Sequence, residues 1–215
     1  MHAGDKATTY SNGATSRTLQ HRGRANFAAF MRRIAATFSP TRVAVAGAAT
    51  GGYGATFNYP RVRAYWPNAK GYLIDDSAPL LVGDAIAPAL RTAWGASWGL
   101  FELTDATCAG CRTDLAAFYT ALSTSFPNDR MALLSSLQDS VTRNYLSLGA
   151  MEYQNALQAL ASTVLGPTAN FRSFFIAGVS HTMLIAGGNT VSGGLTLNAW
   201  LNAMVTDAAW SSAAP

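Results

Sequence analysis

The stretch VAVAGAATGGYG at residues 43–54 passes from a short apolar run into a cluster of glycines. An apolar run of this length, starting at Arg42 and ending at Gly47, is typical of a strand buried on both faces of a parallel sheet. Small residues directly after such a strand are needed where the next helix starts in a sharp turn and packs close to the strand. The stretch therefore predicts a strand, a tight turn and a helix.

Apolar runs and helical periodicities alternate along the rest of the chain. Phe27, Phe30, Met31, Ile34 and Phe38 recur at helical spacing, and Pro40 ends that helix. Strands are expected at 42–47, 72–75, 131–134 and 171–179, and helices at 26–38, 86–94 (broken by Pro88), 114–126 (capped by Thr113), 140–165 and 195–205. This alternation predicts an α/β fold with a mostly parallel sheet and helices on both faces. In such sheets the chemistry gathers at the carboxyl ends of the strands.

Length and composition indicate one globular domain over residues 1–215, in which residues 1–25 form a polar arm that is interpreted as loop. The chain has 215 residues, of which 49% are hydrophobic and 12% charged, and these values exclude a disordered protein. No apolar run approaches the roughly 18 residues of a membrane span, so no membrane span is expected. The chain does not open with a secretory signal pattern, so no signal peptide is expected either.

Basic residues gather in the first part of the chain. The net charge is +4, and six arginines precede the apolar run: Arg17, Arg22, Arg24, Arg32, Arg33 and Arg42. A polyanion site, the solvated face of a helix and an Arg-rich targeting arm would each explain the cluster, and we prefer the last two. No nucleic-acid-binding motif accompanies the charge, so no nucleic-acid partner is predicted.

The two cysteines, Cys108 and Cys111, are separated by Ala-Gly. A structural zinc site needs about four ligands, and no second pair exists. A redox dithiol is disfavoured because no strand precedes the pair. We prefer a local disulfide, which would place the chain in an oxidising compartment. Neither a metal nor an organic cofactor is predicted, because the spacing offers no ligand set.

The Gly47-x-Ala49-x-Gly51 spacing matches the G-x-S-x-G nucleophile elbow, in which a sharp turn lifts one side chain above the sheet. Ala49 stands at the nucleophile position and carries no hydroxyl. The N–H group of Thr50, the next residue, is the expected donor to an oxyanion hole.

Three segments resemble pectin acetylesterases and Notum-like carboxylesterases. These are residues 45–54, the Tyr59-x-Arg61-Val-Arg63 run, and the YLIDDSAP run at 72–79, which are similar to the G-x-S-A-G-G-Y-G elbow and the D-D-S-G-P segment of bacterial members. His2-Ala-Gly-Asp5 and the stretch from His21 to Asn26 are similar to the part of the family just upstream of the elbow. The resemblance implies an α/β-hydrolase fold and a serine-type carboxylesterase. Two departures stand out, since Ala49 replaces the serine and Thr50 replaces an alanine.

Candidates for the other two members of a catalytic triad follow the elbow in the expected order of acid and then histidine. His181 comes directly after the predicted strand at 171–179 and is interpreted as the general base, although a loop histidine can simply be hydrogen-bonded. Asp139 follows the strand at 131–134 and resembles the acid of the family, although it can instead cap the helix from Ser140. Asp75 and Asp76 are the alternatives for the acid.

Two further features concern the pocket. Trp94 and Trp98, with Phe101, lie among glycines and are candidates to line an acyl or sugar site, or else belong to the core. The second oxyanion donor normally comes from a glycine-rich loop upstream of the elbow, and none is found among the residues before Ala49. Several strands of the hydrolase fold are therefore expected to be missing at the amino-terminal side, which would expose a sheet edge and favour self-association or lower stability.

Three functions follow from these patterns. The first is a serine-type carboxylesterase, acting on short acyl or acetyl esters or on polyesters, that is inactive because Ala49 lacks the hydroxyl. The second is a pseudoenzyme that binds an ester, lipid or carbohydrate without turnover. The third, which we disfavour, makes Thr50 the nucleophile, although it lies one place away from the exposed position and is β-branched. The expected partner is a small or polymeric ester, and the family resemblance implies a secreted or periplasmic location.

Overall fold

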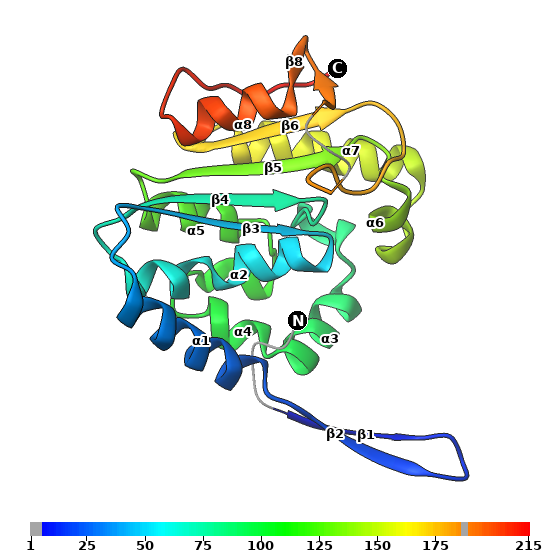
Figure 1. Cartoon of the computed structure of the whole chain (residues 1–215). Coiled ribbons are helices and arrows are strands. Elements are labelled where there is room, and N and C mark those ends of the chain that lie inside the picture. Colours follow the sequence, from blue (N-terminus) through cyan, green and yellow to red (C-terminus); the bar gives the residue numbers. More distant parts are fainter. Residues whose placement is uncertain (1–5, 186–188) are drawn as a thin grey trace.

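A four-stranded parallel sheet forms the centre of the computed structural model, which describes residues 6–185 and 189–215 (Figure 1). The strands lie in the order β3 (Arg42–Ala48), β4 (Lys70–Asp76), β5 (Arg130–Ser136) and β6 (Phe171–Ile176). The register pairs Ala48 with Asp76 and Asp76 with Leu134, so the carboxyl ends of neighbouring strands meet at one edge of the sheet. All four strands match apolar runs in the sequence.

Eight α-helices connect or cover the strands in the described part of the chain. They are α1 (Gly23–Thr37), α2 (Thr50–Tyr65), α3 (Pro88–Trp98), α4 (Leu100–Thr104), α5 (Ala117–Ser125), α6 (Ser140–Tyr145), α7 (Ala150–Leu160) and α8 (Leu197–Val205). Short turns of other helix types span Gly83–Ala85, Ala109–Arg112 and Ala161–Leu165.

Several helix boundaries differ from the sequence prediction. The first helix begins at Gly23 and not at Asn26, and the last begins at Leu197 because Leu195–Thr196 form a short strand. Pro88 does not break a helix but begins α3, where its missing N–H group costs nothing. Thr113 is not a cap, because α5 begins at Ala117 after a turn in which Asp114 Oδ1 accepts the N–H of Ala116. The predicted helix at 140–165 is divided into α6 and α7 by a turn in which Ser147 has a positive φ of 60°.

The core has two parts, one on each face of the sheet. Leu73, Leu133 and Phe171 point to the face covered by α2, α5 and α7. Ile74, Leu134 and Phe174 point to the other face, where they pack against Trp200 and Met204 of α8. Alternate residues of the strands are thus buried in opposite directions, which explains why each strand contains a run of apolar residues instead of a strict polar alternation. The predicted α/β fold with helices on both faces of the sheet is confirmed.

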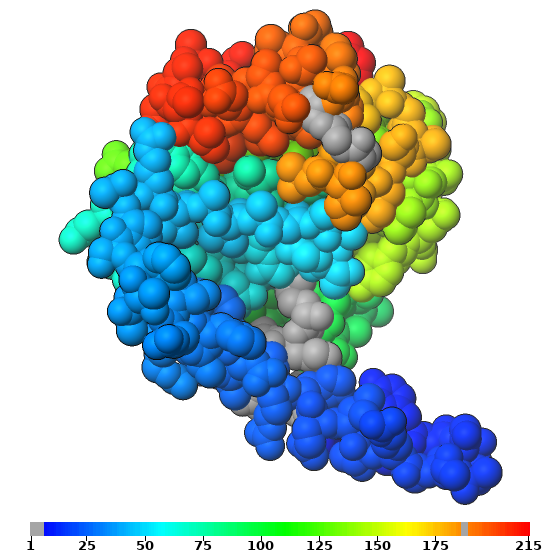
Figure 2. Space-filling view, in the orientation of Figure 1, coloured from blue at the N-terminus to red at the C-terminus, as the bar shows by residue number. Residues whose placement is uncertain are grey.

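The amino-terminal arm is not the loop that its composition predicted. It forms an antiparallel hairpin of β1 (Lys6–Ser11) and β2 (Ser16–His21), and Asn12 Oδ1 closes the turn by accepting the N–H of Thr15. The hairpin extends away from the body of the molecule (Figures 1 and 2). Its side chains are exposed on both faces, so the apolar alternation that identifies a half-buried strand is absent from its sequence.

The strand that leads into the elbow lies at the edge of the sheet, since β3 pairs with β4 alone among the described strands. Ala44 and Ala46 point to the same face as Tyr72 and Ile74 but are exposed, because α8 covers only the other strands. At the opposite edge of the sheet, the segment around Ala213 lies along β6, and the N–H of Phe175 donates to the carbonyl oxygen of Ala213. A short hairpin of β7 (Val191–Ser192) and β8 (Leu195–Thr196) precedes α8.

Cys108 and Cys111 form a disulfide, as preferred from the sequence. The bond lies between α4 and α5, and both cysteines are buried in the larger part of the core. Among residues 6–185 and 189–215, no helix combines the length and the apolar character needed to cross a bilayer.

Candidate active site

The turn between β3 and α2 has the geometry of an elbow. Gly47 and Gly51 pack so closely that a Cβ atom on Gly47 would lie 2.0 Å from the carbonyl oxygen of Gly51. A Cβ atom on Gly52 would lie 2.4 Å from Asp75 Oδ1, at the end of the neighbouring strand. The close approach of α2 to β3 and β4 therefore explains Gly47 and Gly52, at which a Cβ atom would clash.

Ala49, at the tip of this turn, adopts a backbone conformation that non-glycine residues rarely occupy. Its φ is 54° and its ψ is −125°, and its N–H group donates to the carbonyl oxygen of Asp76 at 2.8 Å. A non-glycine residue in such a region costs of order 1–3 kcal/mol, and this kind of strain gathers at functional sites. The conformation directs the side-chain position of residue 49 into a cavity above the carboxyl ends of the strands.

Asp139 and His181 are brought together although 42 residues separate them. His181 Nδ1 lies 2.8 Å from Asp139 Oδ2 and 3.0 Å from Oδ1, and Asp139 is fully buried. With a carboxylate at this distance, Nδ1 is the nitrogen that carries the proton, which leaves Nε2 as the proton acceptor. The imidazole itself is 21% exposed and lines the cavity.

The structure is compatible with both interpretations of Asp139, as the partner of His181 and as the cap of the helix that begins at Ser140. Its Oδ1 atom caps α6 by accepting the N–H groups of Val141 at 2.9 Å and Thr142 at 3.0 Å. The same carboxylate faces His181. Capping by backbone N–H groups fixes the orientation of the carboxylate and offsets the cost of burying its charge.

The alternative acids, Asp75 and Asp76, do not face the imidazole. Asp75 is buried beneath α2, where it accepts hydrogen bonds from Thr56 Oγ1 at 2.9 Å and the N–H of Ala78 at 3.2 Å. Burial raises the pKa of Asp75 to about 8 despite these hydrogen bonds. The carboxylate of Asp76 instead accepts backbone N–H groups of the loop after His181.

A cavity of about 320 Å³ joins residue 49 to the imidazole. It is lined by Ala49, Thr50, Tyr53, Ser77, Trp98, Val141, Thr142, Tyr145 and His181. Its walls are mostly aromatic or apolar, and its polar groups lie beside residue 49 and His181. This is the usual composition of a small-molecule site.

Trp94 and Trp98, which the sequence analysis gave as candidates to line the pocket, differ in their positions relative to the cavity. Trp98 lines the cavity. Trp94 does not, because it is only 2% exposed and lies behind Trp98 and Tyr145. Its ring stacks on that of Trp98 with centroids 4.7 Å apart, and its Nε1 donates to Tyr145 Oη at 2.9 Å. Trp94 thus supports the wall instead of forming its surface.

Thr50, the first residue of α2, lines the cavity, and the N–H groups in the first turn of a helix point outward from its end. In the described part of the chain, no residue before Ala49 is among those that line the cavity. His2, Gly4 and Asp5, which carry the upstream part of the family resemblance, lie outside the described residues. The described residues thus supply one candidate for an oxyanion-hole donor.

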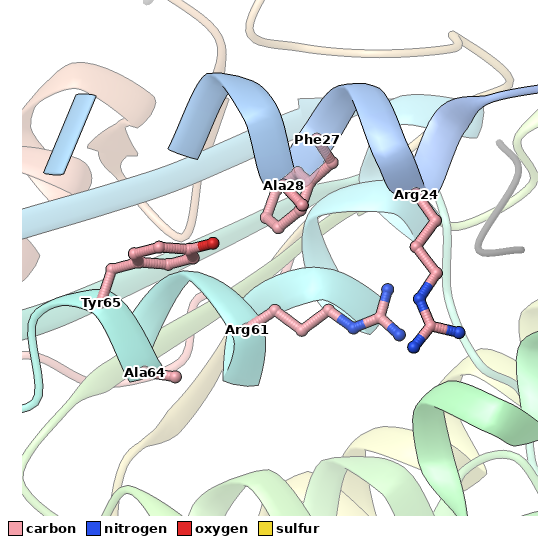
Figure 3. A pocket seen from close by; sticks show the side chains of 6 residues that line it. All are labelled: Arg24, Phe27, Ala28, Arg61, Ala64 and Tyr65. Atoms are coloured by element: carbon pink, nitrogen blue, oxygen red, sulfur yellow. The ribbon is translucent and has the colours of Figure 1, made fainter. Parts of the chain in front are cut away.

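A second hollow lies between α1 and α2 (Figure 3). Arg24 and Arg61 approach each other at one end, with Phe27 and Tyr65 along the sides. Burial lowers the pKa of Arg61, and the neighbouring positive charge of Arg24 lowers it further. Arg24 also pairs with Glu102 at 3.3 Å, so this part of the arginine cluster is partly neutralised. The hollow contains neither a nucleophile nor a general base.

The described residues include no group of three or more His, Cys, Asp or Glu side chains that could hold a metal ion. The polar groups around residue 49 comprise the Asp139–His181 pair, the hydroxyl groups of Ser77 and Thr142, and backbone N–H groups. This set can move protons and donate hydrogen bonds.

Solved structures of the Wnt deacylase Notum from Drosophila share this fold. One is 14% identical, with a TM-score of 0.59 over 84% of this chain and 59% of the Notum chain. Another crystal form is 16% identical, with a TM-score of 0.61 over 91% of this chain and 65% of the Notum chain. This chain therefore spans less than two thirds of the length of these structures. No protein-family profile and no curated protein sequence matches it. At such low identity the likeness establishes the fold alone, a parallel sheet with helices on both faces that this chain shares with the Notum structures.

Sequence reasoning missed five residues that line the cavity beside the predicted ones, namely Tyr53, Ser77, Val141, Thr142 and Tyr145. Ser77 carried a signal, because it belongs to the D-D-S run that ends β4 beside the elbow strand. Val141 and Tyr145 lie on α6, and about half of the surface of each residue is exposed. Because they are half exposed, they belong to no polar or periodic pattern by which the sequence could identify them.

Proposed function

We propose that the chain has the acid, the base and the elbow of a serine-type carboxylesterase, with Ala49 at the position of the nucleophile. The observation that carries this proposal is the strained backbone of Ala49, which opens onto the cavity lined by His181. Notum, which is a Wnt deacylase, has the same fold, and this likeness supports an acyl-transfer reaction. As written, the chain lacks the hydroxyl group and is expected to be inactive.

The reaction of a chain with serine at position 49 would proceed in two steps. His181 Nε2 takes the hydroxyl proton while the oxygen attacks the ester carbonyl, and the N–H of Thr50 donates to the developing oxyanion. The alkoxide leaves with the proton from His181, giving an acyl-enzyme and an alcohol. Water then gives a proton to His181 and attacks the acyl carbonyl. The bond from the acyl carbon to the serine oxygen breaks, the acid is released, and the serine oxygen takes the proton back from His181. Asp139 holds the Nδ1–H tautomer and stabilises the imidazolium.

The walls of the cavity favour an apolar acyl group. Tyr53, Trp98, Val141 and Tyr145 offer no charge to the substrate, and about 320 Å³ accommodates a small acyl or acetyl ester. The cavity is open to solvent at exposed Val141 and Tyr145, so the alcohol part can belong to a polymer. The disulfide supports a secreted or periplasmic location.

Hydrolysis of p-nitrophenyl acetate by the Ala49→Ser variant tests the proposal. The serine is expected to raise turnover by several orders of magnitude, because loss of a triad nucleophile costs on the order of a millionfold. Ala48→Ser is the matched control, since it adds the same hydroxyl one residue earlier on the strand. Ala49→Ser combined with His181→Ala is expected to return to the rate of the parent chain. A folded Ala49→Ser variant that stays silent on acetyl and longer-chain esters would overturn the proposal.

Binding without turnover is the second candidate, and the alanine in the elbow itself favours it. An apolar cavity with a hydrogen-bonding end can hold an ester, a lipid or a carbohydrate whether or not a hydroxyl is present. Tight binding of an unreactive ester analogue by the parent chain, with no gain of turnover on Ala49→Ser, would support this candidate. Turnover measurements on Thr50→Val test the third hypothesis, in which Thr50 is the nucleophile. If the parent chain hydrolyses the ester and Thr50→Val does not, Thr50 is the nucleophile.

A further inference from the structure

Asp76 and Ser77, which follow each other at the end of β4, contact all three segments that meet at the cavity. Both are buried, with at most 1% of their surface exposed. The carbonyl oxygen of Asp76 accepts the N–H of Ala49 at 2.8 Å, which ties this dipeptide to the elbow. The register of the sheet explains the contact, since Ala48 and Asp76 are paired at the ends of β3 and β4.

The side chains of the dipeptide hold the loop that follows His181. Asp76 Oδ2 accepts the N–H groups of Met183 and Leu184, each at 2.8 Å. Ser77 Oγ donates to Asp76 Oδ1 at 3.0 Å and accepts the N–H of Thr182 at 3.1 Å. Three consecutive backbone N–H groups directly after His181 are thus bound by two adjacent side chains.

The third contact reaches the segment of Asp139. The carbonyl oxygen of Ser77 lies 2.9 Å from Thr142 Oγ1, which is also 3.2 Å from Asp139 Oδ2. The N–H of Ser77 donates to Leu134 O on β5 at 2.8 Å, so the dipeptide is itself fixed to the next strand. One dipeptide therefore connects the elbow, the loop of the base and the helix of the acid.

Backbone strain gathers at the same contacts. Five non-glycine residues in the described chain have a positive φ, and three of them are Ala49, Ser77 and Thr182, with values of 54°, 66° and 63°. For a β-branched residue such as Thr182 this conformation is a pronounced outlier. Strain of this kind persists only where surrounding contacts impose it. Here the hydrogen bonds of Asp76 and Ser77 are those contacts.

We infer that Asp76 and Ser77 are positioning residues, which hold the His181 loop so that the imidazole keeps its contact with Asp139 and faces residue 49. The inference rests on the proposed function for its catalytic consequence. The hydrogen-bonded carboxylate fixes the backbone and takes no proton from the substrate. Since a displacement of about 1 Å in a catalytic group can cost on the order of a hundredfold, loss of these hydrogen bonds lowers the rate by displacing the imidazole of His181.

Two readouts test this role on Ser77→Ala and Asp76→Asn, with Asp75→Asn as the matched control. Asp75 is an adjacent and equally buried carboxylate, but its partners are Thr56 of α2, Tyr119 of α5 and the N–H of Ala78, none of which lies on the His181 loop. The first readout is the low-field NMR signal of the Nδ1 proton between His181 and Asp139, recorded in the chain with Ala49. We expect the signal to broaden or disappear in Ser77→Ala and Asp76→Asn and to persist in Asp75→Asn.

The second readout is steady-state kinetics in the Ala49→Ser background. Ser77→Ala is expected to lower kcat by about 10- to 100-fold with KM nearly unchanged, because the substrate pocket remains while the base is displaced. A folded Ser77→Ala variant that keeps both the Nδ1 signal and kcat would overturn the inference. Ser77→Ala removes a single oxygen, so it remains a decisive test if Asp76→Asn does not fold.

The two readouts separate this inference from the proposed function. If Ala49→Ser is inactive but Ser77→Ala abolishes the Nδ1 signal, the dipeptide positions His181 and the esterase proposal fails. If Ala49→Ser is active and Ser77→Ala leaves both signal and kcat unchanged, the esterase proposal stands and the positioning role fails.

Discussion

Asp75 lies fully buried beneath the first turns of α2. Its replacement by asparagine makes it possible to measure how this burial affects the free energy of unfolding. Three donors surround its carboxylate: Thr56 Oγ1 at 2.9 Å, the N–H of Ala78 at 3.2 Å and Tyr119 Oη at 3.3 Å. Burial raises the pKa of Asp75 to about 8, and the nearby charge of Asp76 adds a smaller increase. The carboxyl group is therefore protonated in the folded chain at neutral pH.

The direction of the pH dependence follows from the raised pKa. Below about pH 4 the group is protonated in both the folded and the unfolded chain, and its contribution to stability is fully present. Above that pH the unfolded chain releases the proton while the folded chain keeps it, so stability falls until the pH reaches about 8. The difference between the ordinary value of 3.8 and about 8 corresponds to a loss of about 6 kcal/mol in the free energy of unfolding.

Urea unfolding of the parent chain and of Asp75→Asn, followed by tryptophan fluorescence at several pH values, measures this effect. Asparagine has the shape of the protonated acid but does not titrate. Between about pH 5.5 and 7.5 the parent is expected to lose about 3 kcal/mol relative to the variant, at about 1.4 kcal/mol for each pH unit. Asp84→Asn is the control, because the side chain of Asp84 is 81% exposed, and it is expected to follow the parent. Parallel curves for the parent and Asp75→Asn would refute the argument from burial.

Two further pairs of substitutions test the packing of α2. Gly52→Ala would place a Cβ atom 2.4 Å from Asp75 Oδ1 and is expected to lower the free energy of unfolding by about 1–3 kcal/mol. In Gly51→Ala the Cβ atom meets no atom within 4 Å, so this variant is expected to raise the free energy of unfolding by about 0.5–1 kcal/mol. Equal effects of the two variants in urea unfolding would contradict the close approach of the helix. Asp129→Asn would leave the guanidinium of Arg63, 2.7 Å away and 6% exposed, without its charge partner, and is expected to lower the free energy of unfolding by about 3–5 kcal/mol. Tyr59→Phe removes one hydrogen bond to the same carboxylate and is expected to lower it by about 1 kcal/mol. If Asp129→Asn lowers the free energy of unfolding no more than Tyr59→Phe does, the ion pair is not buried in solution.

Most of the sheet was predictable from the sequence because β4, β5 and β6 are buried on both faces, whereas β3 at the edge is exposed at Ala44 and Ala46. The run at 131–134 is apolar throughout, and the run at 171–176 is interrupted only at Arg172 and Ser173. The hairpin of residues 6–21 gave no such signal, since most of its side chains are exposed on both faces and its two strands pair with each other. Periodicity reports burial, so an element without a buried face is invisible to it.

The site was predictable where chemistry and chain order agree. The elbow spacing, an aspartate after one strand and a histidine after the next one fix three positions without any knowledge of side-chain packing. The wall of the cavity was not predictable to the same degree, because Trp94 and Trp98 lie one helical turn apart on α3. Only the position of Tyr145 decides which of them is covered. The D-D-S run was recognised as a motif, but the partners of Asp76 lie more than a hundred residues away.

The energetic costs of the site bear on the choice between a disabled esterase and a binding protein. The strained backbone at Ala49 would be relieved by glycine, and alanine gives no packing benefit there because the residue faces the cavity. Burial of Asp139 beside a titratable imidazole also costs desolvation free energy that one cap at α6 only partly offsets. A protein that only binds an apolar ligand gains nothing from either feature. Both are instead what a reaction with a nucleophile at residue 49 requires, so restoring that single hydroxyl is the change to which this structure is expected to respond.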